Sequence, residues 1–373
     1  MRKEERLTPK IKRMTSPLGA TMVVDGREVD YFCGTSYYAL HGDRRIIEAA
    51  CHAIQEYGMG PATLMTSPPL AEVETLAARF FDTEAAQYII SGYLTDMTLV
   101  QALRDDYDVA FVDSASHYSV FDGVSSTQKR VVIFCHLNAG DLERKLQEEL
   151  RRGEVPLVIT DGIFPVTGTV APLADYVAVL DRYEKALLCV DDSHAVGVIG
   201  DRGQGSLEYC EVQGPRRYLA GTLSKAFGGL GGVIPADGET KEKIRRNVRI
   251  PIGASPPSSG AAAAAAMGLK IVASNPRMRR QLWENVARMR KGLRELGVDT
   301  GYSPVPIVSV SDMGKVDLEV VQQRLEEKGM LVAYVAPSGY SDAPNCQSLR
   351  IAIFSTHTDE QIDRLIDALA DLL

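Results

Sequence analysis

The sequence predicts an α/β fold built on a mainly parallel sheet, followed by a smaller α+β unit. From about residue 86 onward, short apolar runs alternate with segments whose apolar residues recur at helical spacing. Most of these runs are continuously apolar, which is typical of strands that helices cover on both faces. The predicted strands lie at 86–91, 109–113, 131–134, 156–161, 186–191, 218–222 and 231–234. Intervening segments such as 139–152 and 172–185 are predicted helices.

The pattern changes after about residue 255. Residues 257–296 read as two consecutive helices that are broken near Ser274, Asn275 and Pro276. A strand (306–312), a helix (316–328), two strands (330–336 and 348–354) and a closing helix (359–373) follow. We therefore expect an N-terminal arm (1–43) that packs with the small domain, a large cofactor-binding domain (44–255) and a small C-terminal domain (256–373).

The composition excludes several classes of partner and site. Lysine and arginine total 41 against 49 acidic residues, a net charge of −8, which argues against nucleic acid or an anionic membrane as the main partner. The six cysteines form no CxxC pair and are expected to be free thiols in a reducing compartment. The N-terminus lacks the apolar segment of a secretory signal, so a cytoplasmic location is expected. No histidine or cysteine spacing predicts a metal site.

The segment GTLSKAFGGLGG (221–232) carries the sharpest chemical signal. Lys225 follows an apolar strand and is surrounded by small residues, which leave room beside its side chain. A lysine in such a tight, partly desolvated turn can lose its proton and form an imine with a carbonyl. Thr222 precedes it and offers a hydroxyl suited to a phosphate oxygen.

The segment VDDSHAVGVIG (190–200) supplies carboxylates at the end of a predicted strand. Asp191 and Asp192 should point to opposite faces, so that one reaches a site at the sheet edge while the other caps the following turn. Pyridoxal phosphate needs a carboxylate against its pyridine nitrogen, because a protonated ring is the better electron sink. His194 follows at once and is within reach of the 3-oxygen of that ring.

Other polar residues follow predicted strands or lie inside one. Ser91, Gly92 and Tyr93 should open a helix, whose free N–H groups favour a phosphate. His117 lies just beyond a strand end, where it can stack on a planar ring. Arg350 lies inside an apolar strand, so it needs a carboxylate partner from the protein or from an amino-acid substrate.

In their order and spacing, GTLSKAFG, VDDSHAVGVIG, HYSVFDG and LRIAIFSTHT resemble the motifs of the α-oxoamine synthases. These are fold-type-I pyridoxal-phosphate-dependent transferases of the class I/II aminotransferase-like superfamily, and the resemblance runs from about residue 30 to the C-terminus. It implies pyridoxal 5'-phosphate bound as a Schiff base to Lys225, with Asp191 at the pyridine nitrogen. It also implies that His194 contacts the 3-oxygen and that His117 stacks on the ring.

The resemblance extends to phosphate, substrate and assembly. It implies that Thr222 and the amides of Gly92 and Tyr93 hold the phosphate and that Ser91 and Ser224 also bind the cofactor. Arg350 would grip the substrate carboxylate, and Tyr38 would also contact the substrate. Members of the family are homodimers whose active site lies at the subunit interface, so a homodimer is expected.

Several positions depart from the family pattern on the substrate side. The family's usual Asn-Tyr-Leu-Gly segment is replaced by residues 36–39, and the loop at 59–69 lacks the usual arginine. Leu70 replaces a histidine, and Thr95-Asp96 replaces Ala-Asn. Pro165 replaces a serine that contacts the cofactor, and Thr167 replaces an aspartate.

These departures leave three hypotheses, two of them enzymatic and one non-catalytic. The first is an acyltransferase that condenses an amino acid with an acyl-CoA or acyl-carrier thioester and releases carbon dioxide. The second is CoA-independent chemistry on an amino acid: transamination, elimination or replacement, cyclisation, or retro-aldol cleavage. A non-catalytic scaffold is the third; the joint presence of Lys225, Asp191 and His117 argues against it.

Overall fold

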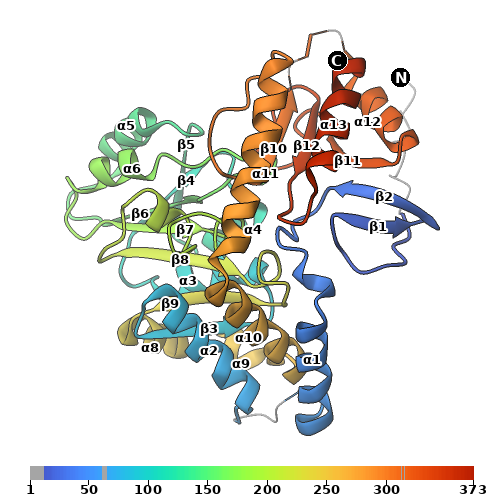
Figure 1. Ribbon diagram of the computed structural model, residues 1–373. Coiled ribbons are helices and arrows are strands. Elements are labelled where there is room, and N and C mark those ends of the chain that lie inside the picture. The colour runs from blue at the N-terminus through green and yellow to red at the C-terminus, as the bar shows by residue number, and fades with distance from the viewer. Residues whose placement is uncertain (1–11, 61–64, 312, 315) are drawn as a thin grey trace, which may run out of the picture.

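The computed structural model describes residues 12–60, 65–311, 313–314 and 316–373, which fold around two sheets (Figure 1). Residues 1–11 of the expected arm and residues 61–64 of the loop at 59–69 lie outside this description. The large sheet has seven strands in the order β3-β9-β8-β7-β6-β4-β5. Its strands are β3 (Ala85–Ile89), β4 (Val109–Asp113), β5 (Arg130–Phe134), β6 (Pro156–Asp161), β7 (Leu187–Asp191), β8 (Arg217–Thr222) and β9 (Gly232–Ala236).

Helices cover both faces of the large sheet, as the apolar runs predict. In β4, Val109 and Phe111 belong to one buried cluster, whereas Ala110 and Val112 belong to another. On one face α3, α4 and α8 pack together. Helix α2 packs on β3 and β9 and also contacts α10, which in turn contacts α1. The helices of this part are α1 (Arg44–Tyr57), α2 (Pro68–Phe81), α3 (Thr95–Ala102), α4 (Tyr118–Ser125), α5 (Ala139–Glu149), α6 (Leu173–Leu180), α7 (Ser206–Tyr209), α8 (Gly238–Asn247) and α9 (Ile250–Gly253), with short 3-10 turns at η1 (Leu40–Gly42) and η2 (Gly92–Leu94).

The direction of β9 is the one departure from a parallel sheet among these strands. Neighbouring strands from β5 to β8 run parallel, but β9 is antiparallel to both β8 and β3. A parallel strand needs a crossover connection of roughly a dozen or more residues. Only residues 223–231 join β8 to β9, so the chain turns back directly, and Lys225 lies in this turn at the carboxyl end of β8.

The small sheet combines both ends of the chain, in the order β1-β2-β11-β12-β10. Its strands are β1 (Thr21–Val24), β2 (Arg27–Phe32), β10 (Ile307–Ser311), β11 (Met330–Val335) and β12 (Ser348–Ala352). The hairpin β1–β2 was not predicted, although Asp25 and Gly26 have the positive φ angles of a tight hairpin turn. Strand β2 pairs in parallel with β11. The three-part domain division with its boundaries stays a prediction.

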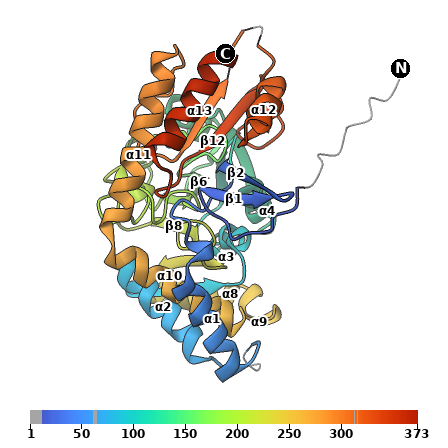
Figure 2. The ribbon, with the colours of Figure 1, turned by 45° about the vertical axis from the view of Figure 1, so that its right-hand side comes forward.

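Long helices connect the two sheets. Helix α10 (Ser259–Ser274) packs on α1 and α2, and α11 (Pro276–Glu295) continues from it beside the large sheet until it lies against α13 (Asp359–Leu372) (Figure 2). Helix α12 (Leu318–Glu327) packs on β11. The predicted break between the two helices is correct, since Asn275 separates them. Among the described residues, no helix is long and apolar enough to cross a membrane.

Candidate active site

The carboxyl ends of the strands in the large sheet surround a polar cavity, where ligands of open α/β sheets bind. Every residue that the sequence selected for the cofactor lines it. The lining residues are Ser91, Gly92, Tyr93, His117, Ser119, Asp161, Asp191, Ser193, His194, Thr222, Ser224 and Lys225. Ser119, Asp161 and Ser193 were not selected. The structure therefore brings together the residues that were predicted from separate segments.

Lys225 lies in the turn between β8 and β9, with its side chain on the cavity. Burial lowers the pKa of its amine to about 8, although the carboxylates of Asp191 and Asp161 oppose this shift. Gly231 in the same turn has a φ of 101°, and an added Cβ would come within 2.6 Å of the Ile89 carbonyl oxygen. The glycine-rich sequence thus allows a close turn that holds a lysine ready to deprotonate.

The two adjacent aspartates separate as predicted. Asp191 lines the cavity, and its Oδ1 accepts a hydrogen bond from the Ser193 amide at 2.9 Å. Asp192 turns away and accepts from the backbone amide (2.7 Å) and the hydroxyl (2.5 Å) of Ser206 at the start of α7. Burial raises the pKa of Asp192 to about 7, while its hydrogen bonds to Ser206 oppose the shift. Asp192 therefore stabilises the fold behind the site.

Hydroxyl groups gather between the end of β3 and the end of β8. Ser91 caps η2, where its Oγ accepts from the Tyr93 amide at 3.3 Å. A Cβ added at Gly92 would lie 2.7 Å from Thr222, so only glycine lets these two strand ends approach so closely. The Thr222 hydroxyl lies 3.1 Å from that of Ser224. Three hydroxyls, one of them at the start of η2, are a donor set that fits the phosphate of pyridoxal phosphate.

Two neutral histidines line the cavity. His117 donates its backbone N–H to Asp161 at 2.8 Å, and its Nε2 lies 2.9 Å from the Tyr340 hydroxyl. Burial lowers the pKa of His117, and the pKa of His194 falls well below its usual value through burial and the nearby Lys225. Both rings are therefore uncharged near pH 7, which suits contact with an aromatic ring.

A second cavity of about 540 Å³ adjoins the first and shares Lys225, His117 and His194 with it. Arg350 lines it from β12, and its Nε donates to the Pro165 carbonyl at 2.5 Å while Nη1 donates to the Gly34 carbonyl at 3.2 Å. Within the described part of the chain, no carboxylate forms an ion pair with Arg350. The guanidinium is thus held in place by carbonyl groups and keeps its charge available to an anion.

The segment at 36–39 differs from expectation in detail. Tyr38 is not among the residues that line either cavity; it is buried, and its hydroxyl donates to the Gly197 carbonyl. Its neighbour Tyr37, which was not selected, places its hydroxyl 2.7 Å from Nδ1 of His194. Tyr37 therefore contacts the cavity's lining from behind, and the predicted substrate contact of Tyr38 has no support in this geometry.

The segment that follows β11 lines the second cavity with Ala336, Gly339 and Tyr340. Asp342 accepts from the backbone amides of Val166 and Thr167, each at 2.9 Å, and from the Thr167 hydroxyl at 3.1 Å. The same loop carries Tyr340, which reaches His117. Residues that replace the family pattern, Pro165 and Thr167, thus hold Arg350 and this loop.

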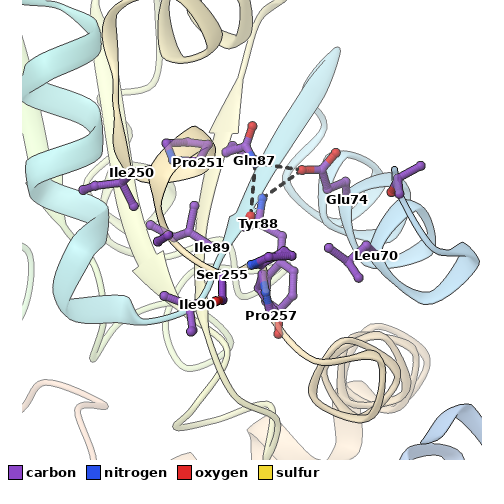
Figure 3. A pocket seen from close by; sticks show the side chains of 13 residues that line it. Leu70, Glu74, Gln87, Tyr88, Ile89, Ile90, Ile250, Pro251, Ser255 and Pro257 are labelled. Atoms are coloured by element: carbon purple, nitrogen blue, oxygen red, sulfur yellow. Dashed lines mark hydrogen bonds between the residues drawn. The ribbon is translucent and has the colours of Figure 1, made fainter. Parts of the chain in front are cut away.

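A more apolar cleft lies between α2, the end of β3 and α9 (Figure 3). Figure 3 shows Ile89, Ile90 and Ile250 on one side and Leu70 on the other. Glu74 closes the polar end, where its Oε1 accepts from the Gln87 side chain and the Tyr88 amide, both at 3.1 Å. Ile90 directly precedes Ser91, so this cleft begins beside the cavity that contains Lys225.

Comparison with known proteins places the chain among pyridoxal-phosphate enzymes. A family model described as aminotransferase class I and II matches residues 34–369. The chain is 34% identical over 374 residues to the 8-amino-7-oxononanoate synthase of Geobacter sulfurreducens. The match covers 99% of this chain and 95% of the relative. The chain is 30% identical to the synthase of Coprothermobacter proteolyticus, over 98% of this chain and 93% of the relative.

Solved structures agree with this assignment. The serine palmitoyltransferase of Sphingomonas wittichii superposes with a TM-score of 0.90 at 25% identity, covering 98% of this chain and 92% of that one. The 8-amino-7-oxononanoate synthase of Francisella tularensis superposes with a TM-score of 0.76 at 21% identity, over 92% and 97% of the two chains. The predicted fold class is therefore confirmed.

Proposed function

We propose a reaction for this chain, which belongs to the aminotransferase class I and II family. Within that family it is an α-oxoamine synthase-like acyltransferase that depends on pyridoxal phosphate. The proposed reaction joins the Cα of an amino acid to the acyl carbon of a thioester and releases the thiol and carbon dioxide. The observation that carries it is the cavity in which Lys225, Asp191 and His117 meet at the carboxyl ends of the strands.

Lys225 is the proposed residue for cofactor attachment and proton transfer. When bound, pyridoxal phosphate supplies an electron sink that makes bonds at the amino acid's Cα breakable. A pKa of about 8 leaves roughly one lysine in ten uncharged at pH 7, so Nζ can accept the Cα proton and return it. Asp191, facing the same cavity, is the proposed partner of the pyridine nitrogen.

The remaining cavity residues have binding and orienting roles in this proposal. His117 and His194, both neutral, would contact the ring face and the 3-oxygen respectively. The hydroxyls of Ser91, Thr222 and Ser224, with the backbone at Gly92 and Tyr93, would hold the phosphate. A cofactor fixed at both ends can present one bond at Cα perpendicular to its ring.

Arg350 is the proposed anchor for the amino acid's carboxylate. Its guanidinium borders the cavity that contains Lys225, and two backbone carbonyls fix its orientation. A bidentate pair with a carboxylate would position Cα next to the lysine. The second substrate in this proposal is an acyl-CoA or acyl-carrier thioester, consistent with relatives named as 8-amino-7-oxononanoate synthases.

A homodimer is part of the proposal. Met65 and Ile252 are each 72% exposed and adjoin Thr66 and Pro251, which line the apolar cleft of Figure 3. Exposed apolar side chains next to the lining of an apolar cleft favour an interface with another chain. Sedimentation of the full-length chain would measure this directly. A cytoplasmic location likewise stays a prediction.

Thiol release tests the proposed reaction. The loaded enzyme is mixed with pooled amino acids and pooled acyl-CoAs, with Lys225→Ala protein as the blank, because Cys51 and Cys135 are exposed and can themselves react. Thiol above the blank that depends on an amino acid is the expected result. No thiol, but ammonia or a keto acid from an amino acid alone, would contradict it and favour CoA-independent chemistry. Turnover that survives in Lys225→Ala would overturn the assignment of the lysine.

A further inference from the structure

Asp96 is a buried acid directly behind the cavity, in the first turn of α3. The Ser119 hydroxyl lies 2.7 Å from Asp96 Oδ2 and 3.4 Å from Asp191 Oδ2. A serine hydroxyl has one hydrogen, so it can satisfy only one of these two carboxylates. The other oxygen of Asp96, Oδ1, is buried and has no hydrogen-bond partner among the described residues.

Two ionised carboxylates in this position would be unstable. An unpaired buried charge is costly, and a second negative charge beside it adds repulsion. Burial raises the pKa of Asp96 well above its usual value, and Asp191 raises it further. One proton held on Asp96 removes the repulsion and gives the pair a hydrogen-bond donor.

We propose that Asp96 is a positioning residue of the cofactor site, a protonated acid that donates toward Asp191 and leaves Asp191 as the ionised member of the pair. The proposal rests on the proposed function, since it takes Asp191 as the partner of the pyridine nitrogen. A pair with one negative charge matches one pyridinium N–H. The family pattern has asparagine at this position, which cannot release a proton, so aspartate makes the charge behind the cofactor dependent on pH.

The surroundings of Asp96 contain other titratable groups that contribute to this balance. Those that face it are Asp191 and Cys189 on β7, Asp161 on β6, Tyr93 before α3, and Lys225. His117 contacts Ser119 instead, with its Nδ1 2.7 Å from the hydroxyl. On α8, which also packs on α3, Lys243 is paired with Asp106 instead. Asp161, whose pKa burial also raises, is retained in the variant tested below.

Unfolding of the cofactor-free protein by urea between pH 5 and pH 8 tests the shared proton. Native Asp96 keeps a proton that the unfolded chain has lost, so the contribution of Asp96 to stability falls as pH rises. Asp96→Asn keeps a neutral side chain of the same shape and lacks this dependence. Relative to the variant, the wild-type unfolding equilibrium constant should rise with pH, by up to about tenfold per pH unit, until native Asp96 loses its proton. Parallel pH profiles would overturn the proposal.

Asp105→Asn is the matched control, because Asp105 follows α3 and its side chain is 74% exposed. Its profile should follow that of the wild type. If Asp96→Asn does not fold, Ser119→Ala is measured in its place. The Ser119 hydroxyl favours ionised Asp96, so without it Asp96 should keep its proton to higher pH. The fall of stability with pH should then extend to higher pH than in the wild type. An unchanged profile in Ser119→Ala would equally overturn the proposal.

The visible absorbance of the loaded protein supplies the second readout. The pH midpoint of its spectral change should be displaced in Asp96→Asn, and an unmoved midpoint would refute a role toward the cofactor. Failure of the proposed reaction has a different signature. In that case thiol release is absent from the wild type while both pH effects of Asp96→Asn persist.

Discussion

The hydroxyl of Tyr37 lies 2.7 Å from Nδ1 of His194, and both side chains are buried. Burial raises the pKa of Tyr37 and lowers that of His194, so the tyrosine keeps its proton and the imidazole is neutral. With the tyrosine donating to Nδ1, the proton of the ring lies on Nε2. The contact thereby selects the tautomer that can donate a hydrogen bond into the cavity.

Replacing Tyr37 by phenylalanine should weaken the site without unfolding the protein. Loss of the donor leaves a buried ring nitrogen unpaired, which costs about 1–3 kcal/mol. We expect kcat/KM to fall about tenfold or more and the visible absorbance maximum of the loaded protein to shift. Tyr57→Phe, at an exposed tyrosine on α1, is the control. Equal effects in both variants would contradict this role for Tyr37.

Gly92→Ala should impair cofactor binding. The added Cβ would lie 2.7 Å from Thr222, so the ends of β3 and β8 would have to separate. We expect the dissociation constant for pyridoxal phosphate to rise by at least about tenfold, equivalent to about 1.4 kcal/mol, as measured by absorbance titration. At Gly140, an added Cβ would meet its nearest neighbour at an ordinary 3.4 Å. Gly140→Ala should therefore bind the cofactor normally.

Arg350→Lys should separate substrate binding from cofactor binding. A lysine keeps the positive charge but loses the planar fork that can hold a carboxylate with two hydrogen bonds. We expect KM for the amino acid to rise about tenfold or more, with unchanged cofactor absorbance. The exposed Arg288, which pairs with Asp359 and Asp363, supplies the control Arg288→Lys. An unchanged KM in Arg350→Lys would mean that the carboxylate binds elsewhere.

Acid should destabilise the fold through His357. Its ring stacks on Phe32 at 4.2 Å, and burial lowers its pKa to about 4 from a usual 6.5. Below pH 6.5 the unfolded chain protonates His357 and the native state does not, so the contribution of His357 to stability falls as pH falls from 6.5 toward 4. The full effect is about 3 kcal/mol.

Urea unfolding at pH 7 and pH 5 measures this effect. His357→Gln should be less stable than the wild type at pH 7, and this difference in stability should shrink by pH 5. His52→Gln, at a side chain that is 77% exposed, should retain the wild-type dependence. If His357→Gln retained it as well, another group would be responsible.

The residues selected for the cofactor could be grouped from the sequence because they follow strands, and the structure brings them to one cavity. Lys225, Asp191 and His117 each lie just beyond an apolar run, and the carboxyl ends of parallel strands meet at one edge. Asp161 could have been found in the same way, since it ends β6 and pairs in register with Asp191. Ser119 could not, because its approach to Asp96 depends on how α3 packs against α4.

Tyr37 and Tyr38 illustrate where a sequence is insufficient. They lie in an irregular segment, where no period assigns neighbouring side chains to faces. Only the packing of that segment against β7 and the turn after it decides that Tyr37 reaches His194 and Tyr38 reaches Gly197. The hairpin β1–β2 had a usable signal at Asp25-Gly26, whereas its parallel pairing with β11 depends on the tertiary fold.

The antiparallel pairing of β3 with β9 has a consequence for biosynthesis. Ile89, two residues before Ser91, pairs with Gly232, seven residues after Lys225. The halves of the proposed cofactor site therefore meet only after most of the large sheet has been translated, and such long-range pairings form slowly. A ribosome-bound chain that ends before β9 cannot assemble this edge. Capture of the cofactor should consequently be a late event that reports on a completed sheet.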